Sequence, residues 1–182
     1  MVDLATCAEM LQDQSHRLAL LEAWLGWRGD DLIPTNDAVI AEDLGTAIGY
    51  ISVLEMPPPD RAIFRLVGEW YERVADWNLL GGNFIDMVAE EHRSTRSERC
   101  WNMATIPCGM LASADGDRPS GRKVEMRALW LPVSPTSPQE PMRLYFAEDV
   151  DLETSMVGYD SINVFPAAWE IDYVGIGYGV PV

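Results

Sequence analysis

The sequence AIFRLVG at residues 62–68, followed by WNLLGGNF at residues 77–84, is the most informative part of the chain about its fold. Phe64 and Leu66 alternate with their neighbours, which is typical of a strand with one buried face. Gly68 allows a sharp change of direction at the end of that strand. These residues predict a strand that turns directly into a helical region.

A longer helix is predicted after the turn at Gly81-Gly82, from Phe84 to about Asn102. Asn83 is a favourable N-cap residue for it. Residues 69–77 are expected to form a short helical stretch before the turn. The charged second half of the long helix, residues 90–99, is expected to be solvated.

Four further strands complete the predicted sheet. Residues 47–56 alternate, and the PPPD run at residues 57–60 would end this strand and make a hairpin with residues 62–67. Residues 108–113, 123–132 and 142–148 follow the long helix. We therefore expect an α+β fold with a five-stranded antiparallel sheet and helices on one face.

The N-terminal residues 1–29 are predicted to form an amphipathic helix. Leucines recur in a heptad-like pattern along it, and two interpretations stay open. The helix packs on its own domain, or it pairs with a second copy in a homodimer. The leucines of this pattern are Leu4, Leu11, Leu18, Leu21 and Leu25.

The C-terminal residues 151–182 form a tail that is too apolar for a solvated segment. Its aromatic and apolar residues either fold back over the sheet or contact another protein. They are Tyr159, Phe165, Trp169, Ile171, Tyr173 and Tyr178.

Residues 62–68 and 77–84 resemble the F-R-L-V-G … D-L-T-G signature of a PAS domain subfamily, composed mostly of small stand-alone proteins of alphaproteobacteria. Trp24 and Arg28, followed by Ile33-Pro34, resemble that subfamily's W … R … L-P segment. Glu125 and Leu131-Pro132 resemble its E … L-P-L strand.

Two segments depart from the subfamily pattern. Thr35-Asn36 stand where an arginine usually follows the proline, and residues 78–80 replace an acidic-leucine-threonine run. The resemblance implies a PAS-like domain at residues 30–150, flanked by the N-terminal helix and the tail.

The resemblance also implies an apolar volume between the helices and the sheet, which in PAS domains either holds a small molecule or is simply the core. Both alternatives stay open. The residues expected to line it are Tyr50, Phe64, Leu66, Phe84, Met87, Trp130 and Phe146.

These observations lead to three hypotheses of function. The first is a non-enzymatic sensory or regulatory module that binds a small apolar ligand and signals in trans to another protein. The second is a ligand-free protein-interaction adaptor. The third is a small enzyme with a cone-shaped α+β sheet, for which the buried acid–base pair is missing from the sequence pattern.

Charge and cysteine content limit the partners and the compartment. The net charge is −16, with 13 basic and 29 acidic residues, which disfavours nucleic acid and anionic membrane surfaces. The sequence shows neither a signal-peptide pattern nor an apolar run of membrane-spanning length. The odd number of cysteines, Cys7, Cys100 and Cys108, favours reduced thiols in the cytoplasm.

We predict no metal site, cofactor or catalytic residue. The two histidines, His16 and His92, lie on separate helices, and Cys100 and Cys108 do not form a C-x-x-C pair. His92 is placed on a charged helix face, which disfavours haem ligation. No phosphate-binding loop or G-x-S-x-G sequence is present, and no segment resembles the flavin-binding motif of light-sensing PAS domains.

Overall fold

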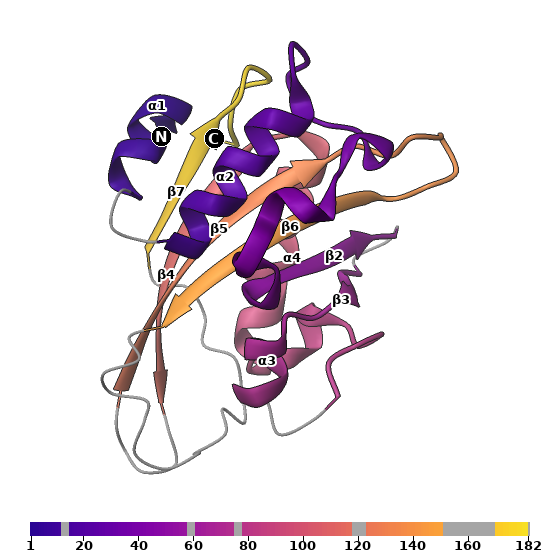
Figure 1. Ribbon diagram of the computed structural model, residues 1–182. Coiled ribbons are helices and arrows are strands. Elements are labelled where there is room, and N and C mark those ends of the chain that lie inside the picture. Colours follow the sequence, from indigo (N-terminus) through magenta and orange to yellow (C-terminus); the bar gives the residue numbers. More distant parts are fainter. Residues whose placement is uncertain (12–14, 58–60, 75–77, 118–122, 151–169, 182) are drawn as a thin grey trace.

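The computed structural model describes residues 1–11, 15–57, 61–74, 78–117, 123–150 and 170–181. Within them, seven strands form one sheet in the order β1-β7-β4-β5-β6-β2-β3 (Figure 1). Short 3-10 helices carry the label η. The elements are β1 (Val2–Asp3), α1 (Leu4–Met10), α2 (Ser15–Arg28), η1 (Asn36–Ala38), η2 (Ala41–Tyr50), β2 (Ile51–Met56), β3 (Ile63–Leu66), α3 (Glu69–Val74), η3 (Phe84–Met87), α4 (Glu90–Thr105), β4 (Gly109–Asp117), β5 (Lys123–Val133), β6 (Met142–Val150) and β7 (Glu170–Gly175).

The α+β prediction is confirmed, but the prediction of five antiparallel strands is wrong. The five predicted strands are present as β3-β2-β6-β5-β4, and each neighbouring pair is antiparallel. Strand β7 adds a further antiparallel pair with β4, and β1 pairs with β7 in parallel. The sequence did not reveal β1 because a two-residue strand is too short to show a period. Strand β7 lies in the segment that we assigned to the tail.

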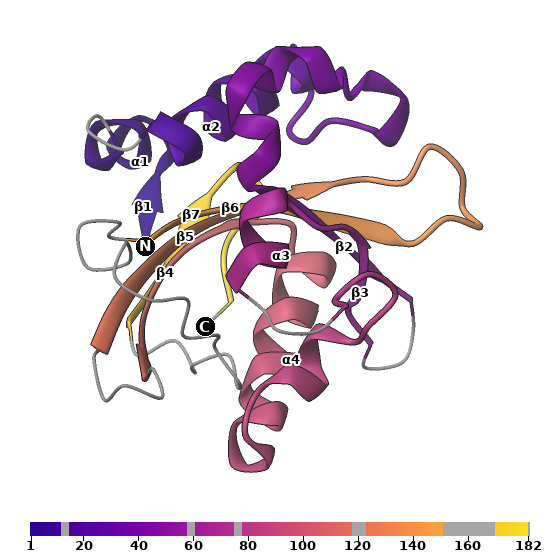
Figure 2. The same ribbon diagram turned by 60° about the horizontal axis from the view of Figure 1, so that its bottom comes forward.

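Helices cover both faces of the sheet: α3 and α4 share one face, as expected, and the N-terminal helices cover the other. Figure 2 shows α1 and α2 on one side of the sheet and α3 and α4 on the other. We call these the outer and the inner face. On β5, Leu129 and Leu131 are buried on the outer face, while Trp130 is buried on the inner face. Such a continuous apolar run is typical of a strand that is buried on both sides.

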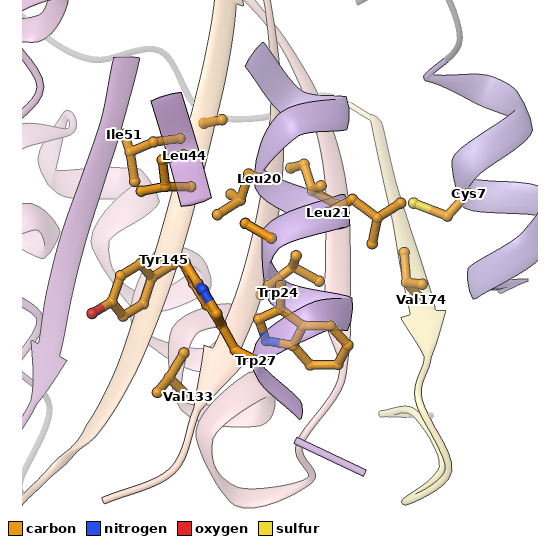
Figure 3. Packing of buried hydrophobic residues seen from close by; sticks show 14 of the residues in the cluster. Cys7, Leu20, Leu21, Trp24, Trp27, Leu44, Ile51, Val133, Tyr145 and Val174 are labelled. Carbon is orange, nitrogen blue, oxygen red and sulfur yellow. The ribbon is translucent and has the colours of Figure 1, made fainter. Parts of the chain in front are cut away.

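The outer core lies between the N-terminal helices and the sheet (Figure 3). Leu20, Leu21 and Trp24 of α2 point toward the strands, and Cys7 of α1 lies near Val174 of β7. The N-terminal helices are therefore part of the core of the chain.

Trp24 fastens α2 to the sheet through a hydrogen bond. Its indole Nε1–H donates to the carbonyl oxygen of Pro132 over 2.8 Å, in a buried position. The guanidinium carbon of Arg28 lies 5.6 Å from the Trp24 ring centroid. Close by, the Ser134 N–H donates to the carbonyl oxygen of Pro34 over 2.8 Å. The segment from Trp24 to Pro34 and the segment around Leu131-Pro132, which both resemble PAS motifs, thus lie side by side.

The N-terminal segment forms two helices rather than the single helix predicted for residues 1–29. α1 begins after Asp3, whose side chain accepts a hydrogen bond from the Thr6 N–H, and α2 runs to Arg28. Of the five leucines, Leu11 and Leu21 are buried within the chain. Leu4, Leu18 and Leu25 are half-buried against the same core. Pairing of this region with a second copy stays a prediction.

Several element boundaries differ from the prediction, three of them by the most. The strand expected from residue 47 begins at Ile51, because the residues before it form η2. The expected helix 84–102 is divided into η3 and α4, and Asn83 caps η3 by accepting from the Ile85 N–H. Strand β4 continues to Asp117, beyond the predicted end at residue 113.

Gly68 occupies a position where a side chain does not fit. A Cβ atom there would lie 2.7 Å from the carbonyl oxygen of Gly49 and 3.0 Å from that of Ile51. The Gly68 N–H donates to Ser52 Oγ over 3.0 Å. The glycine thus allows β3 to turn into α3 while the chain passes close to the start of β2.

We expect Gly68→Ala to lower the free energy of unfolding by about 1–3 kcal/mol, because the added methyl group overlaps backbone atoms. Gly26→Ala is the matched control, since Gly26 lies inside α2 and a Cβ atom added there would meet no other atom within 4 Å. That control should be stabilised by about 0.5–1 kcal/mol. Urea unfolding measures both, and a Gly68→Ala variant as stable as the wild type would contradict the packing described here.

Candidate functional site

Aromatic rings fill the layer between the inner face of the sheet and α3 and α4. Trp130 and Phe146 stack with ring centroids 4.0 Å apart, and Phe84 lies 5.3 Å from Trp130. Phe64 meets Phe84 edge to face at 5.8 Å. Offset stacking and edge-to-face contacts are the favoured arrangements of such rings. The structure thus brings together four of the seven residues that were expected to line the apolar volume.

Met87 is partly buried against the same rings, whereas Tyr50 and Leu66 lie elsewhere. Tyr50 belongs to η2 and stacks on His16, with centroids 3.5 Å apart. Leu66 is 40% exposed, because the pairing of β2 with β3 shifts register between Val53 and Leu54. Tyr50 and Leu66, which were expected to line the apolar volume, therefore lie outside the aromatic layer.

A polar group is buried beside the aromatic rings, and sequence reasoning missed it. We call it the inner polar group: Tyr71 of α3, Arg96 of α4 and Glu148 of β6. The Tyr71 hydroxyl donates a hydrogen bond to the Glu148 carboxylate. Arg96 Nη1 donates to the Phe84 carbonyl oxygen over 3.1 Å, and its guanidinium carbon lies 4.2 Å from the Phe84 ring centroid. The group therefore links α3 to β6 and α4 to η3.

Burial determines the protonation of this group. It raises the pKa of Tyr71 well above its usual value, and the Glu148 charge raises it further. Burial also lowers the pKa of Arg96 to about 10, against the attraction of Tyr71 and Glu148 among other groups. At neutral pH Tyr71 is therefore a neutral donor and Arg96 a cation.

Two spacings could have revealed the inner polar group. On β6, Leu144 and Phe146 face the inner side of the sheet, and Glu148, two residues further along the strand, faces the same side. On α4, Arg96, Cys100 and Met103 follow the i, i+4, i+7 spacing of one helix face, and the last two are buried. The expectation that residues 90–99 are entirely solvated is therefore corrected at Arg96, while His92 is exposed as expected.

The three cysteines are buried free thiols. Burial raises the pKa of Cys7 and Cys108 to about 11 and that of Cys100 to about 12. Since the thiolate is the nucleophile, none of them is activated at neutral pH.

Among the residues that the structure describes, no group of three or more His, Cys, Asp or Glu side chains is arranged to hold a metal ion. In the same residues, no helix has the length and apolar character needed to cross a membrane.

Comparison with known proteins gives one family match. A family model described as a PAS domain matches residues 12–145, from just before α2 into β6. The PAS-B domain of Drosophila melanogaster Cycle, solved as a tryptophan-to-alanine variant with bound glycerol, is similar with a TM-score of 0.42 and 12% identity. That similarity covers 56% of this chain and 98% of the other. No curated protein matches the chain.

Proposed function

We propose a sensory or regulatory role for this chain, which belongs to the PAS domain family. In this proposal it is not an enzyme. It binds a small, largely apolar ligand between the sheet and the inner helices and passes the signal in trans to another protein. The resemblance of residues 62–68 and 77–84 to the alphaproteobacterial subfamily supports placing it there, and the three free thiols support a cytoplasmic setting.

The observation that carries the proposal is the burial of the inner polar group within an aromatic layer. Moving charged side chains out of water costs several kcal/mol per ion. Apolar residues of similar volume in the same positions often make a protein equally stable or more stable. Ionisable groups with shifted pKa values also cluster at functional sites. Glu148 and Arg96 are thus suited to recognise the polar end of a ligand whose apolar part contacts Phe84 and Trp130.

The same group gives ligand binding a route to the rest of the chain. A ligand that hydrogen-bonds to Glu148 competes with Tyr71, and so alters the link between α3 and β6. On the other face of β6, the Tyr145 ring lies 5.8 Å from Trp27 of α2. A shift of β6 would therefore reach the outer helices, where we place the contact with the signalling partner.

A second candidate function is a ligand-free adaptor, which the close packing of the inner rings favours. With Trp130 and Phe146 already stacked at 4.0 Å, the rings supply one another with the contacts that a ligand would make. In that case the inner polar group only fixes the helices on the sheet.

Native mass spectrometry separates the two candidates. The sensory proposal predicts a small non-covalent adduct on the purified chain that disappears on denaturation. Glu148→Gln should lower its occupancy, whereas Glu72→Gln, at an exposed site on the same helix as Tyr71, should leave it unchanged. An adduct-free wild-type chain, or equal occupancy in both variants, would leave the adaptor as the better account.

We also propose a homodimer formed through the N-terminal region, supported by the half-buried Leu4, Leu18 and Leu25. Light scattering should then give twice the chain mass of 20.3 kDa. Leu18→Asp should give the monomer mass because it places a charge in the contact. The control is Leu80→Asp, since Leu80 is 55% exposed and distant in sequence. A monomeric wild-type chain would overturn this proposal, whether or not the variant folds.

A further inference from the structure

A groove of about 400 Å³ lies on the outer face, between η2 and the strands β2, β3 and β6. Its volume falls within the range of roughly 300–1,000 Å³ that is usual for small-molecule sites. Leu44 and Ile48 of η2, Ile51 and Val53 of β2 and Leu66 of β3 form its apolar wall. The groove is on the opposite face of the sheet from the inner polar group.

The groove changes from apolar to charged along β2. Ile51, Val53 and Glu55 share one face of the strand, and Glu55 lies opposite Arg143 in the pairing with β6. Glu55 Oε1 accepts from Arg143 Nη2 over 3.0 Å, and Glu55 Oε2 accepts from Arg65 Nε. Two arginines therefore flank one buried carboxylate, so these three groups together carry a charge of +1, and the exposed Glu140 is also close enough to Arg143 for that arginine to help lower its pKa.

Arg65 has further N–H donors that could bind an anion. A guanidinium carries five N–H donors, and Arg65 bonds to Glu55 through Nε alone among the described residues. Its side chain is 57% exposed. Glu55 fixes the orientation of both guanidinium groups, so a carboxylate at the groove would meet donors that are already positioned.

The free edge of β3 is closed to an added strand, which favours a small molecule over an extended peptide. The Phe64 N–H donates to the Gly82 carbonyl over 3.0 Å, and the Gly81 N–H donates to the Phe64 carbonyl over 2.9 Å. The backbone groups of Phe64 that an added strand would need are thus already used.

The charge of the whole chain determines where the binding energy must come from. A chain of net charge −16 does not attract anions over long distances, and at physiological salt its field decays over about 8 Å. An anion would therefore need an apolar part that is buried in the groove, while the arginines act locally and set its orientation.

We propose that this groove binds a small amphipathic anion, an aliphatic chain with a terminal carboxylate. The chain lies along Ile48, Ile51 and Val53, and the carboxylate accepts hydrogen bonds from Arg65 and Arg143. This site is independent of the ligand proposed for the inner face.

Titration of the methyl-labelled chain with decanoate, followed by carbon–proton correlation NMR, tests the proposal. The methyl signals of Leu44, Ile48, Ile51 and Val53 should shift and saturate, and decanol, which lacks the charge, should bind more weakly. Arg65→Gln should weaken decanoate binding roughly two- to tenfold, the range for losing a partly exposed charge-assisted hydrogen bond. Arg61→Gln, at an exposed arginine nearby, is the control with the same loss of charge.

A second pair of variants distinguishes a specific loss of decanoate binding from a folding defect. Ile48→Glu places a negative charge on the groove wall and should abolish decanoate binding. Ile106→Glu makes the same change at a comparably exposed isoleucine outside the groove, and binding should persist. The proposal is overturned if the methyl signals of the groove do not shift, or if those of the inner face shift instead. It is also overturned if Arg61→Gln weakens decanoate binding as much as Arg65→Gln, or if the methyl signals saturate only because two copies of the chain associate.

Discussion

The buried hydrogen bond from the Trp24 indole to the Pro132 carbonyl joins α2 to the middle of a sheet that needs cover on both faces. Strands β5 and β6 carry buried side chains on each side, so the outer face would expose Leu129, Leu131 and Ala147 without the N-terminal helices. Each fully buried side chain of the Leu or Val type contributes about 1.5–3 kcal/mol relative to exposure. The outer helices are therefore required by the sheet, and the side chain that donates to Pro132 fixes where α2 lies.

Strand β6 connects the two candidate sites because its residues alternate between the faces. Phe146 and Glu148 point into the inner layer, while Arg143 and Tyr145 line the outer groove. Because successive side chains of a strand point to opposite faces, neighbouring residues of β6 belong to the two different proposed ligand sites. The two proposed sites therefore share β6 as a structural element, and neither proposal depends on the other.

Much of the sheet was predictable from local pattern, and much of the site was not. The alternation of Met126, Ala128 and Trp130 placed β5 correctly, and the glycine at residue 68 marked the turn that the packing requires. The sequence left the packing of the N-terminal segment open, because a heptad of leucines suits packing on a sheet as well as pairing with a copy. Local spacing shows that Arg96 and Glu148 face the inner core, but it does not show the tertiary contacts that bring them together with Tyr71. The charged end of the groove depends on strand register, because the pairing of β2 with β6 places Glu55 opposite Arg143.

The packing of the outer core implies that the outer helices and the sheet unfold as one cooperative unit. Native-state amide hydrogen exchange tests it most directly, because it reports the free energy of opening for each segment. We expect the amides of α2 around Leu21 and Trp24 to exchange with the same opening free energy as those of β5 around Leu129 and Leu131. If α2 instead opens at a much lower free energy while β5 stays protected, the outer helices are an appendage and do not form a cooperative unit with the sheet.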